Sequence, residues 1–209
     1  MTRATLSALA LAAALAAGCA APGPAPERPA AAAQALLRLS PASLQRALKL
    51  QQHITVEFTA QGRTERRELL ALLEADAVRT RLAAVGGGQV LARLDWDGTT
   101  LQVTRAPWAP AELQPERILS DLQLALWPAA AIRAALPAGW TLEATPALRQ
   151  LRQGSETVAE IRFPDAATTL FVQHRDGYRL TIRNLPAGAG ESAGESAGES
   201  ARANAGGAA

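Results

Sequence analysis

The sequence contains very few of the residue types on which catalysis and metal binding commonly depend. Its 209 residues include one cysteine, two histidines, one tyrosine and one methionine. One cysteine cannot form an internal disulfide. The two histidines, His53 and His174, have no Cys, second His or H-x-x-x-H partner nearby and fall short of the three or four ligands of a metal site. We therefore expect no metal site and no cofactor.

Motifs for nucleophilic catalysis and phosphate binding are also lacking. Outside the repeat at 190–201, the chain has no G-x-S-x-G; it has no S-x-x-K and no Cys/His pair, and "GGGQ" at 86–89 fits neither glycine-rich phosphate-binding pattern. The stretch "DWDG" at 95–98 begins like a calcium loop, but the later acidic ligands are missing, so a hairpin turn is favoured. The sequence predicts a protein that is not an enzyme.

No basic stripe is present, although the formal net charge is +2 and the pI is about 9.3. Lys49 is the only lysine among 21 basic residues, and the arginines alternate with acids, as in "RTERRELL" at 63–70. Such interleaved charge is typical of a solvated surface. We expect no nucleic-acid partner.

Only one apolar run is long, and it lies at the N terminus. Residues 1–18 combine Arg3, an apolar stretch over 4–17 and small residues at the end, which is the pattern of a secretory signal peptide. The run is shorter than the ~20 residues of a spanning helix. We therefore predict an exported chain that is otherwise soluble.

Composition divides the rest of the chain into three parts. Residues 19–33 are rich in proline and alanine and predict an extended tether. Residues 34–186 have the length and patterning of one folded domain. Residues 187–209 include a tetrapeptide repeated three times, "GESAGESAGESA" at 190–201, and predict a disordered tail.

Alternation of apolar and polar residues predicts two blocks of strands. In the first block, residues 52–105, Ile54, Val56 and Phe58 share one face of a strand. The stretch "RTERRELLALLEA" at 63–75 also suits a helix, but its strand-like neighbours favour a strand. The second block covers residues 140–185. The two blocks together predict about ten antiparallel strands.

Helices are predicted before and between the two blocks. A short helix is expected over 33–39, after which Ser40 and Pro41 suit the N-cap and first turn of another helical segment. Pro115 begins a helix that Pro128 limits, and one or two further turns follow before Pro137. An apolar stripe marks one face of the 115–127 segment. The stripe consists of Ile118, Leu119, Leu122 and Leu126.

These elements predict an α+β fold. Ten consecutive antiparallel strands with one apolar face curl into a curved sheet. A helical block in the middle of the chain can then cover the concave side. We expect an unclosed half-barrel lidded by helices.

The tryptophans all fall at element ends or in loops, and two interpretations remain open for them. They pack at the edge of the core, or they form a rim around an apolar cavity or contact a membrane interface. Trp96 and Trp108 are the candidates for membrane contact. The candidates for lining a cavity or its lid are Ile118, Leu122, Leu126 and Trp127.

The stretch "LAAGC" at 15–19 resembles the lipobox of bacterial lipoproteins. This resemblance implies that Cys19 carries diacylglycerol, that the signal is cut before it, and that the new amine is acylated. Because Ala20 and not aspartate follows, it also implies an outer-membrane destination, with the protein facing the periplasm. Several chains on one residue give firm anchoring, since stable anchoring takes two lipid signals. The alternative is an incidental cysteine in a signal cut elsewhere.

Three further stretches resemble a family of small uncharacterised proteobacterial outer-membrane lipoproteins. They are "ILSDLQLALWP" at 118–128, "LRQ" around Arg149 and "DGYRLTIRNL" at 176–185. The resemblance covers about residues 35–186. That family in turn resembles LolA and LolB, the carrier and receptor of lipoprotein localisation. It implies a lidded half-barrel with a cavity for acyl chains, and a protruding apolar loop that we place at 83–91.

Two functional hypotheses follow. The first is a lipid-anchored outer-membrane protein that binds or transfers a lipid or acylated cargo in an apolar cavity. The second is a non-catalytic structural or adaptor lipoprotein that binds a membrane-assembly partner. A cavity of several hundred Å³ under the helices would favour the first, whereas a packed interior would contradict it.

Overall fold

The computed structural model describes residues 36–109 and 114–186. The predicted signal peptide at 1–18, the tether at 19–33 with Cys19, and the tail at 187–209 lie outside the described residues and remain predictions.

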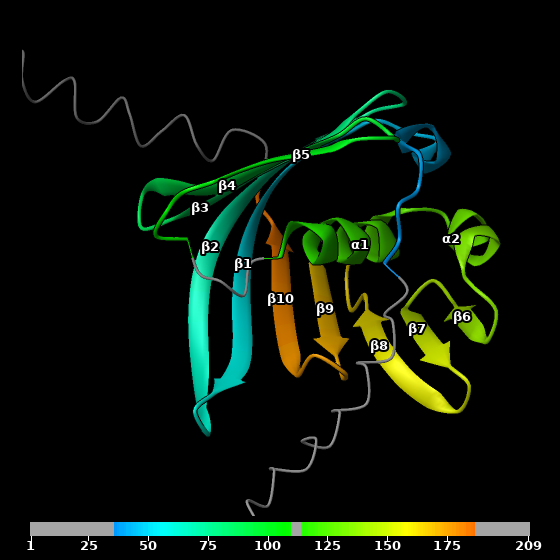
Figure 1. Cartoon of the computed structure of the whole chain (residues 1–209). Helices are drawn as coiled ribbons and strands as arrows, with labels where there is room; N and C mark the ends of the chain where they lie inside the picture. The colour runs from blue at the N-terminus through cyan, green and yellow to red at the C-terminus, as the bar shows by residue number, and fades with distance from the viewer. Residues whose placement is uncertain (1–35, 110–113, 187–209) are drawn as a thin grey trace, which may run out of the picture. The chain divides into compact units, whose positions relative to one another are not determined.

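Ten strands form one antiparallel sheet (Figure 1). The order of neighbours is β5-β4-β3-β2-β1-β10-β9-β8-β7-β6, so β5 and β6 stand at opposite edges and the sheet is unclosed. The strands are β1 Leu48–Ala60, β2 Arg63–Ala75, β3 Thr80–Gly86, β4 Gln89–Trp96, β5 Leu101–Arg105, β6 Trp140–Ala144, β7 Leu148–Gln153, β8 Glu156–Arg162, β9 Thr168–Gln173 and β10 Tyr178–Asn184.

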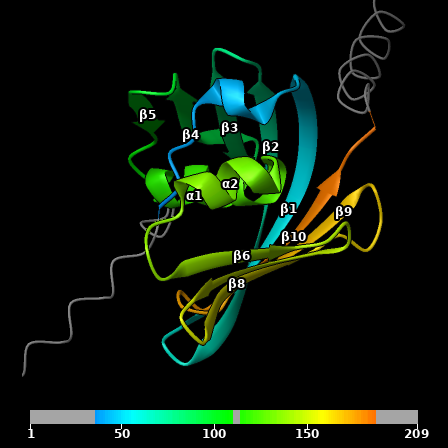
Figure 2. The ribbon, with the colours of Figure 1, turned by 90° about the vertical axis from the view of Figure 1, so that its right-hand side faces the viewer.

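The pairing of β1 with β10 joins the two blocks of strands. Ile54 lies opposite Ile182 and Phe58 lies opposite Tyr178 in this pair. In Figure 2 the sheet bends at this seam, so that β2–β5 rise on one side of the helices while β6–β10 pass beneath them. The seam therefore makes one curved surface out of two meanders.

Two helices lie on the concave side of the sheet, α1 Pro115–Leu126 and α2 Ala129–Ala135. Pro115 stands in the first turn of α1, where its missing N–H has no cost. Pro128 separates the two helices. The predicted α+β half-barrel with a helical lid is confirmed.

The helix predicted over 33–39 is wrong for the residues that the structure describes. Residues 36–40 have no regular secondary structure, and a short 3₁₀ helix, η1 Pro41–Leu44, follows with Ser40 as its N-cap. The backbone N–H groups of Leu37 and Leu39 donate to side chains of α1. These bonds replace the backbone bonds that a helix would provide.

The protruding loop predicted at 83–91 is also wrong. Strand β3 runs to Gly86 and β4 begins at Gln89, so only Gly87 and Gly88 connect them. Both have positive φ, 57° and 75°, which the tight turn requires and which glycine adopts without strain. The segment is a hairpin and presents no apolar loop tip.

Most of the buried apolar side chains belong to two clusters, and α1 contributes to both. The main cluster joins α1, α2 and β6–β10 with the segment before β1 and the end of β2, and Trp127, Ile132 and Phe171 are fully buried in it. The second cluster is much smaller and consists of Leu94, Trp96 and Leu119, against which Leu82, Leu101 and Ile118 pack. The helix therefore rests on a thick core on one side and a thin one on the other.

Candidate functional site

Helix α1 is buried on two sides, and this changes which of its residues face the core. Leu119 and Gln123 are 0% exposed and Leu124 is 3% exposed. Ile118 of the predicted stripe packs on the second cluster, whereas Leu122 packs on the main one. The residues of the predicted stripe therefore pack on two clusters, and the helix buries polar positions outside the stripe as well.

Segment 36–40 is fastened to α1 by buried polar side chains. Gln123 accepts from the Leu39 N–H at 2.8 Å through Oε1 and donates to the Leu39 carbonyl at 2.9 Å through Nε2. Ser120 Oγ accepts from the Leu37 N–H at 3.0 Å. Trp96 Nε1 donates to the Leu39 carbonyl at 2.8 Å, so β4 holds the same segment. These hydrogen bonds provide partners for the backbone of segment 36–40, which belongs to no helix or strand.

A second polar contact joins α1 to the turn between β9 and β10. The Tyr178 hydroxyl donates to Asp121 Oδ2. Arg117 Nη2 lies 3.1 Å from Asp176 Oδ2, and Arg117 Nη1 lies 4.0 Å from Asp121 Oδ1. We call these four residues, Arg117, Asp121, Asp176 and Tyr178, the polar latch.

Burial sets the protonation of the polar latch. Loss of water raises the pKa of Asp121 to about 7, although the Tyr178 hydroxyl and the Arg117 charge act in the opposite direction. Burial also raises the pKa of Tyr178, and the neighbouring Asp121 raises it further. Tyr178 therefore remains a hydrogen-bond donor at any physiological pH.

Arginines satisfy the carbonyl groups at the C-terminal end of α1. Arg149 of β7 donates through Nη1 to the carbonyls of Leu124 at 2.7 Å and Trp127 at 2.8 Å. Arg46 donates to the carbonyl of Leu126 at 3.3 Å. A cation at this position is favourable, because the last carbonyls of a helix have no partner within it.

The three stretches that carried the family resemblance meet around α1. Asp121 and Gln123 belong to "ILSDLQLALWP", Tyr178 belongs to "DGYRLTIRNL", and Arg149 belongs to "LRQ". No contact of these four residues was predicted from the sequence. The available signals were the single tyrosine of the chain and the acid and amide inside an apolar helix.

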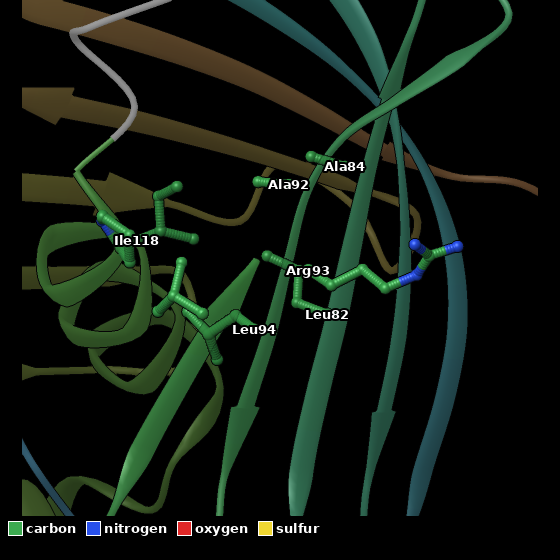
Figure 3. A pocket seen from close by; sticks show the side chains of 8 residues that line it. Leu82, Ala84, Ala92, Arg93, Leu94 and Ile118 are labelled. Atoms are coloured by element: carbon green, nitrogen blue, oxygen red, sulfur yellow. The ribbon is translucent and has the colours of Figure 1, made fainter. Parts of the chain in front are cut away.

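An apolar hollow lies between the N-terminal half of α1 and strands β3–β5 (Figure 3). Its floor is formed by Ala84 and Ala92, whose small side chains leave the space that Ile118 and Leu94 face. Its volume of about 10 Å³ is close to the minimum for a single water molecule. The hollow is lined by Leu82, Ala84, Ala92, Arg93, Leu94, Val103, Pro115 and Ile118.

The predicted cavity residues therefore do not gather in one place. Ile118 lines the hollow, whereas Leu122 and Leu126 are half-buried against the main cluster. Trp127 is 0% exposed in the centre of that cluster, and its Nε1 donates to the Ser40 carbonyl at 3.3 Å. A position inside a filled core cannot line an open cavity.

The two candidates for membrane contact differ in exposure. Trp96 is 2% exposed and bonded to Leu39, so its assignment to membrane contact is wrong. Its indole N–H had a backbone partner that the sequence did not reveal. Trp108 is 61% exposed, and its contact with a membrane remains a prediction.

The described part of the chain has neither a candidate metal centre nor a membrane-spanning helix. No group of three or more His, Cys, Asp or Glu side chains there could hold a metal ion. His53 lies 3.5 Å from Glu68 on the surface of the sheet, and His174 is exposed near the β9–β10 turn. No helix among these residues has the length and apolar character needed to cross a membrane.

The fold and the α1 site define an open antiparallel half-barrel with a helical lid. The chain belongs to the DUF3261 family, described as a protein of unknown function, which matches residues 49–186. This match covers all ten strands apart from the first residue of β1, and both helices. A search of curated proteins found no match to the chain.

Proposed function

We propose that the protein is an outer-membrane-anchored lipoprotein that binds the apolar part of a lipid or acylated cargo between α1 and strands β3–β5, in the manner of LolB. The observation that carries the proposal is the hollow on the thin side of α1. The hollow is too small for an acyl chain in this conformation, so binding requires α1 to separate from these strands.

The contacts of α1 favour movement at this side. Towards segment 36–40 and the β9–β10 turn, α1 is held by directional polar contacts such as Gln123–Leu39 and Asp121–Tyr178. Towards β3 and β4, Leu119 and Ile118 make apolar contacts. An acyl chain can replace apolar contacts at little cost, because it buries the same kind of surface. It cannot replace buried hydrogen bonds.

Two features support a location at the membrane. Cys19 lies outside the described residues, and its lipobox-like context supports a lipid anchor. Trp108 is exposed in the turn after β5, and that turn is tied to β4 by the bond from Ala106 N–H to the Leu91 carbonyl. Because Leu91 precedes Ala92, this turn lies beside the floor of the hollow.

Uptake of a fluorescent fatty acid tests the proposal. The full chain carrying Cys19→Ser avoids detergent, because it lacks the proposed lipidation site. In this background Ala92→Leu fills the hollow, and we expect uptake to fall by about tenfold. The matched control is Ala83→Leu, since Ala83 precedes Ala84 on β3 and therefore lies on the opposite face of the sheet. This control should retain uptake.

The second candidate is an adaptor that binds a membrane-assembly partner. The small size of the hollow favours it, because a volume of about 10 Å³ cannot hold an acyl chain without movement of α1. Native mass spectrometry of the same chain after export to a Gram-negative periplasm separates the two. Co-purifying lipid or acyl peptide supports the carrier. No lipid and no fatty-acid uptake in any variant contradicts the carrier and leaves the adaptor.

A further inference from the structure

Three arginines from different parts of the chain meet at the C-terminal end of α1. Arg46 follows η1, Arg133 lies on α2 and Arg149 lies on β7. Arg46 and Arg149 bind carbonyls of residues 124–127, as described above. Arg133 Nε donates to the Leu142 carbonyl on β6 at 3.0 Å. We call these three residues the arginine cluster.

The positive charges of the arginine cluster are not neutralised by ion pairs within the described part of the chain. Among the described residues, none of the ion pairs involves Arg46, Arg133 or Arg149. Their hydrogen bonds all go to neutral carbonyls and use a minority of the five N–H groups that each guanidinium carries. Six other arginines, at 66, 79, 81, 117, 162 and 175, each face a carboxylate, whereas several exposed arginines of the sheet, such as Arg63, form no ion pair with any described residue either. The cluster is distinguished by the meeting of three such cations at one place.

The three charges act on one another. Burial lowers the pKa of Arg149, and the positive charges of Arg46 and Arg133 lower it further. The Arg149 guanidinium also lies over the Phe163 ring, 5.6 Å from its centre, which holds it in place. Arg46 and Arg133 are exposed at the surface around it. A fixed, partly buried cation is thus flanked by two accessible ones.

Helix capping accounts for only two members of the arginine cluster. Arg149 binds two of the terminal carbonyls of α1, and Arg46 binds a third. Arg46 follows Gln45, which ends η1 as a left-handed C-cap with φ of 61°. Arg133 binds no carbonyl of α1, because its Nε donates to the Leu142 carbonyl on β6. Its charge at this position is therefore not needed to cap the helix.

We propose that Arg46, Arg133 and Arg149 form a binding site for a phosphate group, either free or as the headgroup of a lipid. Guanidinium groups bind phosphate oxygens through paired N–H donors, and several of them can share one tetrahedral anion. A dianion also relieves the repulsion among three cations that have no carboxylate partner. The inference does not depend on the apolar hollow, which lies at the other end of α1.

Calorimetric titration of the full chain carrying Cys19→Ser tests the site with three probes. They are inorganic phosphate, dihexanoyl phosphatidic acid and dihexanoyl phosphatidylcholine, all at low ionic strength. We expect phosphate and phosphatidic acid to bind. In the double variant Arg46→Gln, Arg133→Gln, their affinity should fall by at least about tenfold. Arg149 is left intact because it caps α1.

The matched control is Arg63→Gln, which removes an exposed arginine at the β1–β2 turn. It should leave the affinity unchanged. Equal binding of both phosphate probes supports free phosphate as the ligand, and tighter binding of phosphatidic acid supports a lipid headgroup. The proposal is overturned if neither probe binds, if phosphatidylcholine binds as tightly as phosphatidic acid, or if Arg63→Gln weakens binding as much as the double variant does.

Discussion

The two halves of the sheet pack against α1 through apolar clusters of very different size. Strands β6–β10 are short, and Ala159, Ile161 and Phe171 on them belong to the main cluster and are no more than 1% exposed. Strands β1–β5 include the two longest strands and also bury side chains, such as Leu73 at 1% exposure, yet the cluster between β4 and α1 has three buried members and borders the hollow. The polar latch also binds α1 to the β6–β10 half. Helix α1 is therefore bound to the β6–β10 half by polar contacts, whereas it meets the β1–β5 half through apolar packing.

The largest expected effect is the loss of a large side chain from the thick core. We expect Phe171→Ala to lower the free energy of unfolding by about 3–5 kcal/mol, because its neighbours are fully buried and cannot collapse into the space. Leu101→Ala in the other half should cost about 1 kcal/mol, because Leu101 is half-buried at the sheet edge. Denaturant unfolding of both variants measures the difference. Equal losses would show that the two halves are packed alike.

Adding volume gives the second comparison. Ala159 is 0% exposed beneath the main cluster, so Ala159→Leu should destabilise the chain by about 1–3 kcal/mol through overpacking. Ala92→Leu extends into the hollow, whose volume of about 10 Å³ takes up part of the added side chain, and should destabilise the chain by no more than about 1 kcal/mol. Thermal unfolding of the two variants at one protein concentration provides the measurement. A larger loss for Ala92→Leu would mean that the hollow is filled.

The pH dependence of stability tests how α1 is held. The pKa of Asp121 is raised in the folded chain, to about 7, above its ordinary value in the unfolded chain. The folded state therefore binds more protons between about pH 4 and pH 7, and the contribution of Asp121 to stability is complete below about pH 4 and is lost as the pH rises through about 7. We expect a loss of roughly 1–3 kcal/mol over this range.

Asp121→Asn should remove this part of the pH dependence, because the amide cannot ionise and its oxygen still accepts from the Tyr178 hydroxyl. Denaturant unfolding between pH 4 and pH 8 compares the variant with the parent chain. An unchanged pH profile would show that Asp121 does not titrate in this range.

Local patterns in the sequence were sufficient to predict most of the sheet. Period-two alternation and the turn in "DWDG" at 95–98 predicted the strands, because side-chain direction and turn geometry depend on neighbouring residues. The ambiguous stretch at 63–75 became β2 through its neighbours. The stretch forms a strand despite its helix-like pattern, because every residue of β2 pairs with β1.

The site could not be predicted in the same way, because its contacts span long distances in the sequence. Gln123 reaches Leu39 and Asp121 reaches Tyr178, and no local period marks such pairs. Trp96 looked like a surface residue because it precedes a turn, but segment 36–40 covers it. Polar residues on an apolar helix were the only local sign that α1 is buried on both sides.

The smallest expected effect on stability is at the exposed rim of the thin half. Trp108→Ser should change the free energy of unfolding by less than about 0.5 kcal/mol, because the side chain is 61% exposed. If Trp108 contacts the membrane interface, the same variant in the Cys19→Ser chain should reduce flotation with lipid vesicles, since indole favours that interface. Val78→Ser, at an exposed turn after β2, is the matched control. A loss of stability above about 1 kcal/mol would assign Trp108 to packing, and equal flotation of both variants would exclude it from membrane contact.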